Sequence, residues 1–129
     1  HVVKDPDTIA SAIRIGNPAS WELAIKAHAD SDGYFGAITD EKILEAHRIL
    51  SSEVGIFVEP ASAISVAGLL ERAEAGAIPK GATVVLTVTG HGLKDPQWAL
   101  RTADGSDVKP TIVSVDTDEV AAVLGLARA

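Results

Sequence analysis

A threonine followed at once by two closely spaced glycines is the part of the sequence best suited to chemistry. The stretch "TVVLTVTGHGLKDP" places Thr89 directly before Gly90, with Gly92 two residues further on. A hydroxyl donates or accepts a hydrogen bond without carrying charge, and glycine lets the backbone come close to a flat or bulky ligand. Lys94 and Asp95 are candidates to hold this loop through local polar contacts. A G-x-G pair alone is weak evidence, because a tight structural turn explains it about as well as a ligand site does.

Two charged residues stand in otherwise apolar surroundings. Glu59 follows the run "GIFV" and opens the weakly polar stretch "PASAISVAGLL". If Glu59 is buried as a carboxylate, it needs a partner. A role in a site and a first-turn acid that gains from the helix dipole are both open interpretations. Arg14 lies within "AIRIG". A buried arginine is usually paired with a carboxylate or a phosphate, and a structural salt bridge is the commoner explanation.

The histidines do not have the spacing of a metal site. The chain has four of them and no cysteine, so we expect no bound metal and no disulfide. His91 lies between the loop glycines and is the one histidine in a position to face a ligand. No G-x-S-x-G, Walker or G-x-G-x-x-G motif occurs, so the sequence gives no support for a serine hydrolase, nucleotide or dinucleotide site.

Length and charge narrow the class of protein further. The chain has 129 residues, is 47% hydrophobic and carries a formal net charge of −7. That length suits one domain, and the negative charge argues against a nucleic-acid partner. No apolar run approaches the roughly 18 residues that a membrane helix needs, so we expect no membrane association and a cytoplasmic location. The sequence opens at His1 and contains no Met, which favours a piece of a longer protein over a mature processed product.

Three helices are predicted, over residues 17–33, 39–55 and 59–76. Asn17 is the expected N-cap of the first helix, and Pro18 suits its first position. Thr39 is the expected N-cap of the second, which Gly55 ends, while Gly76 ends the third. The first half of the third helix consists mostly of small residues, which indicates that a neighbouring segment packs very closely on it. A helical turn at 97–100 and a final helix at 116–126 complete the set.

Strand candidates alternate with these helices, which predicts an α/β protein. They are residues 8–15, 34–38, 56–58, 83–88 and 112–115; the first is alternatively a buried helical turn, and the last an extended arm. The continuous apolar run 83–88 is typical of a strand covered on both faces of a parallel sheet. Ligands bind at the carboxyl ends of such strands, where Thr89 lies. The strands are too few for a complete doubly wound domain, so we expect exposed apolar edges.

Three stretches together resemble the C-terminal part of bacterial threonine synthases. They are "TIASAIRIGNPASW", "TDEKILEAHRILSSEVGIFVEPASAISVAGLL" and "VVLTVTGHGLKDP". The resemblance covers residues 8–100 and extends loosely to the wider fold-type II pyridoxal-phosphate enzymes, including the serine and threonine dehydratases. It implies a mostly parallel sheet with flanking helices, incomplete in this chain. Residues 1–105 would form the C-terminal portion of the cofactor-binding domain, and 106–129 a tail with a short strand and helix.

The resemblance also implies a reaction and a site. Threonine synthases convert O-phospho-L-homoserine and water into L-threonine and phosphate with pyridoxal 5′-phosphate as cofactor. By its match to the family, Thr89 would face the pyridine nitrogen of the cofactor, and Gly90 would bring the backbone close. Glu59 would stand near the cofactor ring, and Ala12 and Ile13 would run along its other side.

Other parts of the family's site have no counterpart in the sequence. The motif around the lysine that binds the cofactor covalently is missing, as are the phosphate loop and the Ser and Asn groups that hold substrate. No catalytic residue is therefore assigned, and we expect the isolated chain to be inactive. It would need the N-terminal part of the enzyme, or self-association, to cover its apolar edges, and would form a homo-oligomer when complete. Two alternatives remain: a non-catalytic α/β half-domain that binds a small anion or a partner protein, and a relative such as a dehydratase with another substrate.

Overall fold

A computed structural model describes residues 1–101 and 106–126 of the chain. The chain divides into two compact units, His1–Trp98 and Ala99–Ala129, and each is treated by itself. The loop at residues 89–95, called the Thr89 loop below, belongs to the first unit. Within the described residues, no helix combines the length and the apolar character needed to cross a membrane.

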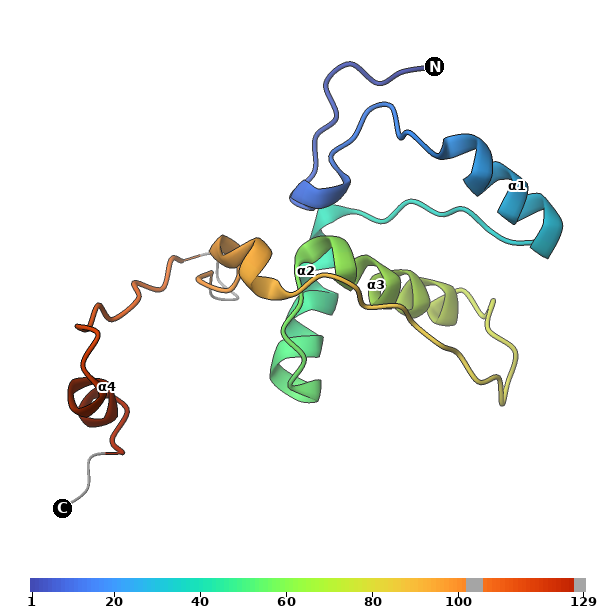
Figure 1. The fold of residues 1–129 in the computed structure, drawn as a ribbon. Helices are drawn as coiled ribbons and strands as arrows, with labels where there is room; N and C mark the ends of the chain where they lie inside the picture. The colour runs from blue at the N-terminus through green and yellow to red at the C-terminus, as the bar shows by residue number, and fades with distance from the viewer. Residues whose placement is uncertain (102–105, 127–129) are drawn as a thin grey trace. The chain divides into compact units, whose positions relative to one another are not determined.

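Two packed helices form the centre of the first unit (Figure 1). Helix α2 spans Asp40–Ile49 and continues into the π-helical turn η2, Leu50–Val54; helix α3 spans Pro60–Glu74. The buried apolar core consists of side chains from these elements and from the segment between them: Ile43, Ala46, Leu50, Val58, Ala63 and Ala67. The alanines on both helices let the two backbones approach closely, which confirms the close packing predicted for the small-residue half of α3.

Local signals account for the ends of these two helices. The Thr39 hydroxyl accepts a hydrogen bond from the Lys42 amide at 3.5 Å, which confirms the predicted N-cap. Gly55 and Gly76 adopt positive φ angles of 73° and 68° just beyond η2 and α3, as expected of terminating glycines. Lys42 also joins α2 to α3 through Glu71, with Nζ and Oε2 2.7 Å apart. This hydrogen bond raises the pKa of Lys42 above its usual value.

Helix α1, Trp21–Ser31, differs from its prediction. It begins at Trp21 after Ser20, so Asn17 is not its N-cap and Pro18 is not its first residue. No side chain caps this end, and every residue of α1 is solvent-exposed. Short helices are marginal in water without a packed face, and this helix contributes no buried residue within the described chain. Its start is therefore weakly determined by local sequence.

The predicted strands do not form a sheet in the described residues. The ladder contacts are two isolated antiparallel bridges, Val58 with His91 in the first unit and Arg101 with Asp107 in the second. Residues 34–38 and 83–88 run extended without a paired neighbour (Figure 1). A strand needs a second strand to satisfy its backbone N–H and C=O groups, and no described segment provides one for 83–88. The prediction of a mostly parallel sheet is thus not confirmed.

The remaining predicted elements are short helical turns and one helix. Residues 8–15 contain the 3₁₀ turn η1, Ser11–Ile13, so the helical turn is confirmed, but its residues are exposed and its predicted burial is wrong. After the glycine loop come η3, Gly92–Lys94, and η4, Pro96–Trp98. In the second unit, α4 spans Thr117–Val123, and the Asp116 carboxylate caps it by accepting from the amides of Asp118 and Glu119. Residues 112–115 form no strand there.

Candidate functional site

The loop after Thr89 lies against the start of helix α3. The Glu59 amide donates to the Gly90 carbonyl at 3.0 Å, and the Gly92 amide donates to the Phe57 carbonyl at 3.2 Å. With the bridge between Val58 and His91, these bonds join two segments about thirty residues apart in the chain. The N-terminus of α3 and the Thr89 loop are therefore held together by backbone hydrogen bonds.

The two glycines are required by protein groups that press against them. A Cβ atom on Gly90 would overlap the Glu59 carboxylate and lie 2.8 Å from Glu59 Cγ. A Cβ atom on Gly92 would overlap the Phe57 ring. From the sequence, glycine at these positions suggested close approach of a ligand. In the structure, the close approach that they permit is to Glu59 and Phe57.

Glu59 is a buried carboxylate with a partner. It is 4% exposed, and its Oε1 accepts from the Nζ of Lys94 at 3.1 Å. It is the N-cap residue of α3, yet its side chain makes no capping hydrogen bond and turns to the loop instead. Glu59 therefore has the partner that a buried carboxylate needs, and it stands at the N-cap instead of in the first turn; its role near a ligand stays a prediction.

Thr89 is exposed, and a buried serine stands behind it. The Oγ of Ser62 lies 3.3 Å from the Oγ1 of Thr89 and accepts a hydrogen bond from the Gly90 amide at 2.6 Å. Ser62 is 3% exposed and lies in the first turn of α3. We did not single it out from the sequence. The available signal was a serine inside the small-residue run that follows a buried carboxylate.

Asp95 connects the loop to the chain's first segment. It is 5% exposed, its Oδ2 accepts from the Ser11 hydroxyl at 2.8 Å, and its Oδ1 accepts from Gln97. Ser11 opens η1, which contains Ala12 and Ile13 and packs on α3. Both of these residues are exposed. The Asp95 bond thus holds η1 to the Thr89 loop.

The contacts of Lys94 and Asp95 reach far along the chain. We predicted that these two residues hold the loop through local polar contacts. The contact of Asp95 with Gln97 is local, as predicted. In addition, Lys94 binds a residue 35 positions away and Asp95 binds one 84 positions away, so both residues also hold the loop to other segments.

Arg14 and His91 remain outside the polar cluster around Glu59 and Thr89. Arg14 is exposed and donates through Nε to the Thr8 carbonyl at 2.9 Å; it forms no ion pair within the described chain, so the predicted salt bridge is wrong. The Nδ1 of His91 accepts from the Leu93 amide at 3.1 Å. In the neutral ring, the proton is therefore on Nε2.

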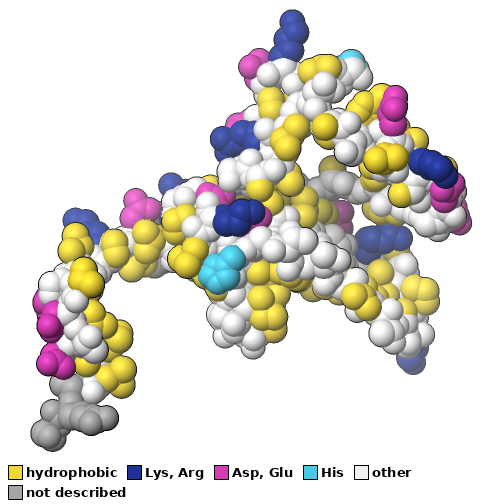
Figure 2. Space-filling model, viewed as in Figure 1, with side chains coloured by type: hydrophobic (Ala, Val, Ile, Leu, Met, Phe, Trp, Pro, Cys, Tyr) yellow, Lys and Arg dark blue, Asp and Glu magenta, His cyan; other side chains and the backbone are white. Residues whose placement is uncertain are grey.

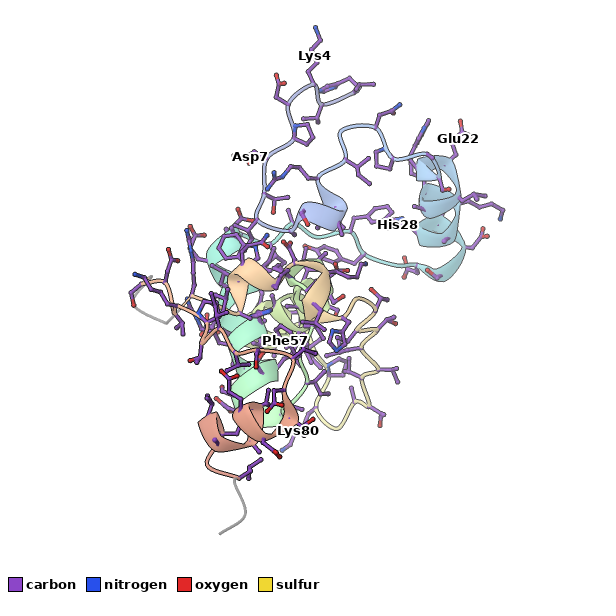
Figure 3. All side chains as sticks on the ribbon, turned by 60° about the vertical axis from the view of Figure 1, so that its left-hand side comes forward. Lys4, Asp7, Glu22, His28, Phe57 and Lys80 are labelled. Atoms are coloured by element: carbon purple, nitrogen blue, oxygen red, sulfur yellow. The ribbon has the colours of Figure 1, made fainter. Side chains whose placement is uncertain are left out.

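The aromatic ring of Phe57 packs against the Thr89 loop. Phe57, labelled in Figure 3, meets the His91 ring edge-on with centroids 5.7 Å apart, and the His47 ring with centroids 6.2 Å apart. His47 is a buried residue of α2, and burial lowers its pKa, opposed by a backbone hydrogen bond with Val58. Phe57 thus joins the core of the two helices to the loop.

Among the described residues, no group of three or more His, Asp or Glu side chains is arranged to hold a metal ion.

Comparison with known proteins identifies the class. The family described as "Pyridoxal-phosphate dependent enzyme" matches residues 1–90, so this chain belongs to the family of pyridoxal-phosphate-dependent enzymes. Within it, the chain is 50% identical to the threonine synthase of Halalkalibacterium halodurans over 116 residues, which are 90% of this chain and 32% of that protein. It is 52% identical to the threonine synthase of Mycobacterium leprae over 96% of this chain and 33% of that protein. The threonine synthase of Synechocystis is 50% identical over 95% of this chain and 31% of its own length.

These matches confirm the predicted family resemblance and its cofactor, pyridoxal phosphate. The chain spans about a third of the length of the curated relatives it matches, and it corresponds to their C-terminal part. The chemistry of two residues is compatible with one side of this cofactor. Thr89 is an exposed residue with an uncharged hydroxyl, and the buried carboxylate of Glu59 is paired with Lys94.

Proposed function

We propose that this chain forms the C-terminal part of a threonine synthase, which converts O-phospho-L-homoserine and water into L-threonine and phosphate. Identities of 50–52% over at least 90% of the chain support this choice of reaction. The observation that carries the proposal is the setting of Thr89. The residue is exposed at the end of an extended apolar segment, and buried groups of α3 hold the loop that follows it.

Thr89 is proposed to hydrogen-bond the pyridine nitrogen of the cofactor. Pyridoxal phosphate, when bound, supplies an electron sink for loss of the substrate's phosphate and addition of water. A neutral hydroxyl can orient the ring whether or not its nitrogen carries a proton, whereas a carboxylate requires that proton because it only accepts hydrogen bonds. The Glu59 carboxylate lies beside Gly90 and is paired with Lys94. The group offered to the ring nitrogen is therefore the uncharged hydroxyl of Thr89.

Ala12 and Ile13 are proposed to line the other side of the ring. The bond from Ser11 to Asp95 holds their turn to the Thr89 loop, and both side chains are exposed. In this arrangement their role is to position the ring by apolar contact. The lysine that carries the cofactor, its phosphate site and the substrate-binding groups would come from the N-terminal part of the enzyme, and the whole enzyme is expected to be a cytoplasmic homo-oligomer.

A chimaera tests the reaction. In it, this chain replaces the matching C-terminal segment of the Halalkalibacterium halodurans threonine synthase. We expect the chimaera to release phosphate from O-phospho-L-homoserine and to form L-threonine, while the 129-residue chain alone does neither. A folded chimaera that binds cofactor but forms no L-threonine would count against the threonine synthase assignment and leave a relative such as a dehydratase. A folded chimaera that binds no cofactor would favour the non-catalytic half-domain.

Thr89→Val in this chimaera tests the key contact, because it removes a hydroxyl and keeps the shape. We expect the dissociation constant of pyridoxal phosphate to rise about tenfold, the size of one lost hydrogen bond, with a shift in the absorbance of the bound cofactor. Thr87→Val is the matched control, an exposed threonine of the same extended segment. Equal effects of the two substitutions, or none from Thr89→Val, would remove Thr89 from the site.

A further inference from the structure

Ser62 has two partners in the Thr89 loop, and both contact one oxygen atom. The Gly90 amide lies 2.6 Å from Ser62 Oγ, and the Thr89 Oγ1 lies 3.3 Å from it. Ser62 is 3% exposed, so water does not readily replace either partner. A buried serine placed in this way controls both the path of the loop and the orientation of the hydroxyl beside it.

The chemistry of the three groups sets a preferred direction for these hydrogen bonds. An amide N–H only donates, so Ser62 accepts from Gly90 and uses one lone pair. The Ser62 hydroxyl also has one proton to donate, and Thr89 Oγ1 is the acceptor that lies within reach of it. If Ser62 donates there, Thr89 accepts from behind and keeps its own proton for a group on its exposed side.

We propose that Ser62 is a positioning residue that makes the Thr89 hydroxyl a hydrogen-bond donor toward an aromatic ring nitrogen that carries no proton. This rests on the proposed function, because it specifies the protonation state of the cofactor nitrogen that Thr89 meets. With the opposite direction, Thr89 would donate to Ser62 and offer only lone pairs outward. It would then select a protonated ring nitrogen.

The same helix provides a matched control. Ser65 lies one turn after Ser62 in α3 and is half-buried. Its hydroxyl donates to the Ser62 carbonyl at 3.1 Å, a contact confined to the helix. Ser65→Ala therefore removes a hydroxyl from the same surroundings without touching the Thr89 loop.

The experiment measures pyridoxal phosphate binding to the cofactor-free chimaera by titration. Ser62→Ala should raise the dissociation constant about tenfold, as expected for the loss of one orienting hydrogen bond, while Ser65→Ala changes it less than about twofold. Ser62→Cys keeps the shape of the side chain with a somewhat larger atom and weakens its hydrogen bonding, so it should act in the same direction if Ser62→Ala folds poorly. Hydrogen exchange at the Gly90 amide should accelerate in both Ser62 variants and not in Ser65→Ala.

A double variant separates positioning from a purely structural role. If Ser62 acts through Thr89, then Ser62→Ala should have little further effect on cofactor binding when Thr89→Val is already present. An unchanged tenfold loss in that background would overturn the proposal. The absorbance of bound cofactor should also report a ring nitrogen without a proton across the pH range of the folded enzyme. A protonated nitrogen in the unsubstituted chimaera would overturn the inferred direction.

Failure of this proposal is distinguishable from failure of the proposed function. If Thr89→Val leaves cofactor binding unchanged, the site itself is wrong. If Thr89→Val weakens binding while both Ser62 variants bind normally, the site stands and Ser62 does not position its hydroxyl.

Discussion

Two regions of the molecule contain similar aliphatic residues but differ in how far they bury them. One is the pair of packed helices with the Thr89 loop, and the other is the set of extended apolar segments. Ile43 of α2 is 1% exposed, whereas Val85 in the extended segment 83–88 is 88% exposed. Both are aliphatic β-branched residues, but Ile43 finds partners on α3 and Val85 finds none in the described chain. The helix pair buries its apolar core within this chain. The extended segment is as apolar as a core, but no described segment packs on it.

Exposed apolar side chains are found on several segments of the chain. Figure 2 shows yellow apolar side chains open on the surface it displays. Those of the first unit include residues of α1 and of the extended segments: Trp21, Leu23, Ile25, Tyr34, Phe35, Val84 and Val85. Two contacts hold the segment at 34–35: Tyr34 lies under the Arg72 guanidinium at 4.3 Å, and Phe35 stacks on His28 of α1 with centroids 4.8 Å apart. Both rings make these contacts while remaining largely exposed.

The largest expected effect compares one aliphatic residue from each region. Ile43→Ala should reduce the free energy of unfolding by about 3 kcal/mol, because it leaves a cavity between α2 and α3. Val85→Ala should change it by less than about 0.5 kcal/mol, since the side chain is exposed. Urea unfolding of the 129-residue chain, followed by circular dichroism, measures both. A large loss from Val85→Ala would show that 83–88 is covered in solution, for example by a second copy, and would break the comparison.

A smaller effect tests the contact between α3 and the loop. Gly90→Ala should cost about 2 kcal/mol, because the added Cβ displaces the buried Glu59 side chain from its contact with Lys94. Gly68→Ala is the control within α3, where an added Cβ has open space. It should stabilise the chain by up to about 1 kcal/mol, as alanine favours helix over glycine. If both substitutions behave alike, the loop does not pack on Glu59 as described.

The smallest expected effect is a pH dependence from the core. Burial lowers the pKa of His47, so the folded state binds a proton less readily than the unfolded chain does. The contribution of neutral His47 is therefore present above about pH 6.5 and is lost as pH falls below that value toward the lowered pKa, at about 1.4 kcal/mol per unit of difference. His47→Gln should flatten this part of the stability profile, measured by urea unfolding between pH 7.5 and 5. His28→Gln, at an exposed position of α1, should leave it unchanged; an equal flattening would assign the dependence elsewhere.

Family membership changes how the site residues are weighed. From spacing alone, Thr89 and its glycines were compatible with a plain turn. The structure then explained both glycines by protein packing, which by itself would favour the structural interpretation. Thr89 remains the candidate because it is an exposed residue with a hydroxyl, in a chain that belongs to a cofactor-dependent family.

The sequence by itself determined the features that depend on near neighbours. The Thr39 cap and the glycines that end η2 and α3 were predictable because each involves residues within one helical turn. Glu59 and Thr89 could be singled out because a charge or hydroxyl at the edge of an apolar run is visible in the sequence. Where a local cue had no packing to support it, as at Asn17 and Pro18, the helix began elsewhere.

Only the tertiary structure decided which distant groups meet. Ser62 holds the loop at Gly90, and Asp95 holds Ser11 across 84 residues, yet neither pairing leaves a periodic or spaced signal in the sequence. The same reason explains why the described residues form no sheet. A strand pattern specifies a backbone that is ready to pair, but hydrogen bonds form only where a second strand lies beside it. Helices satisfy their hydrogen bonds internally, so α2 and α3 form here while residues 83–88 remain extended and unpaired.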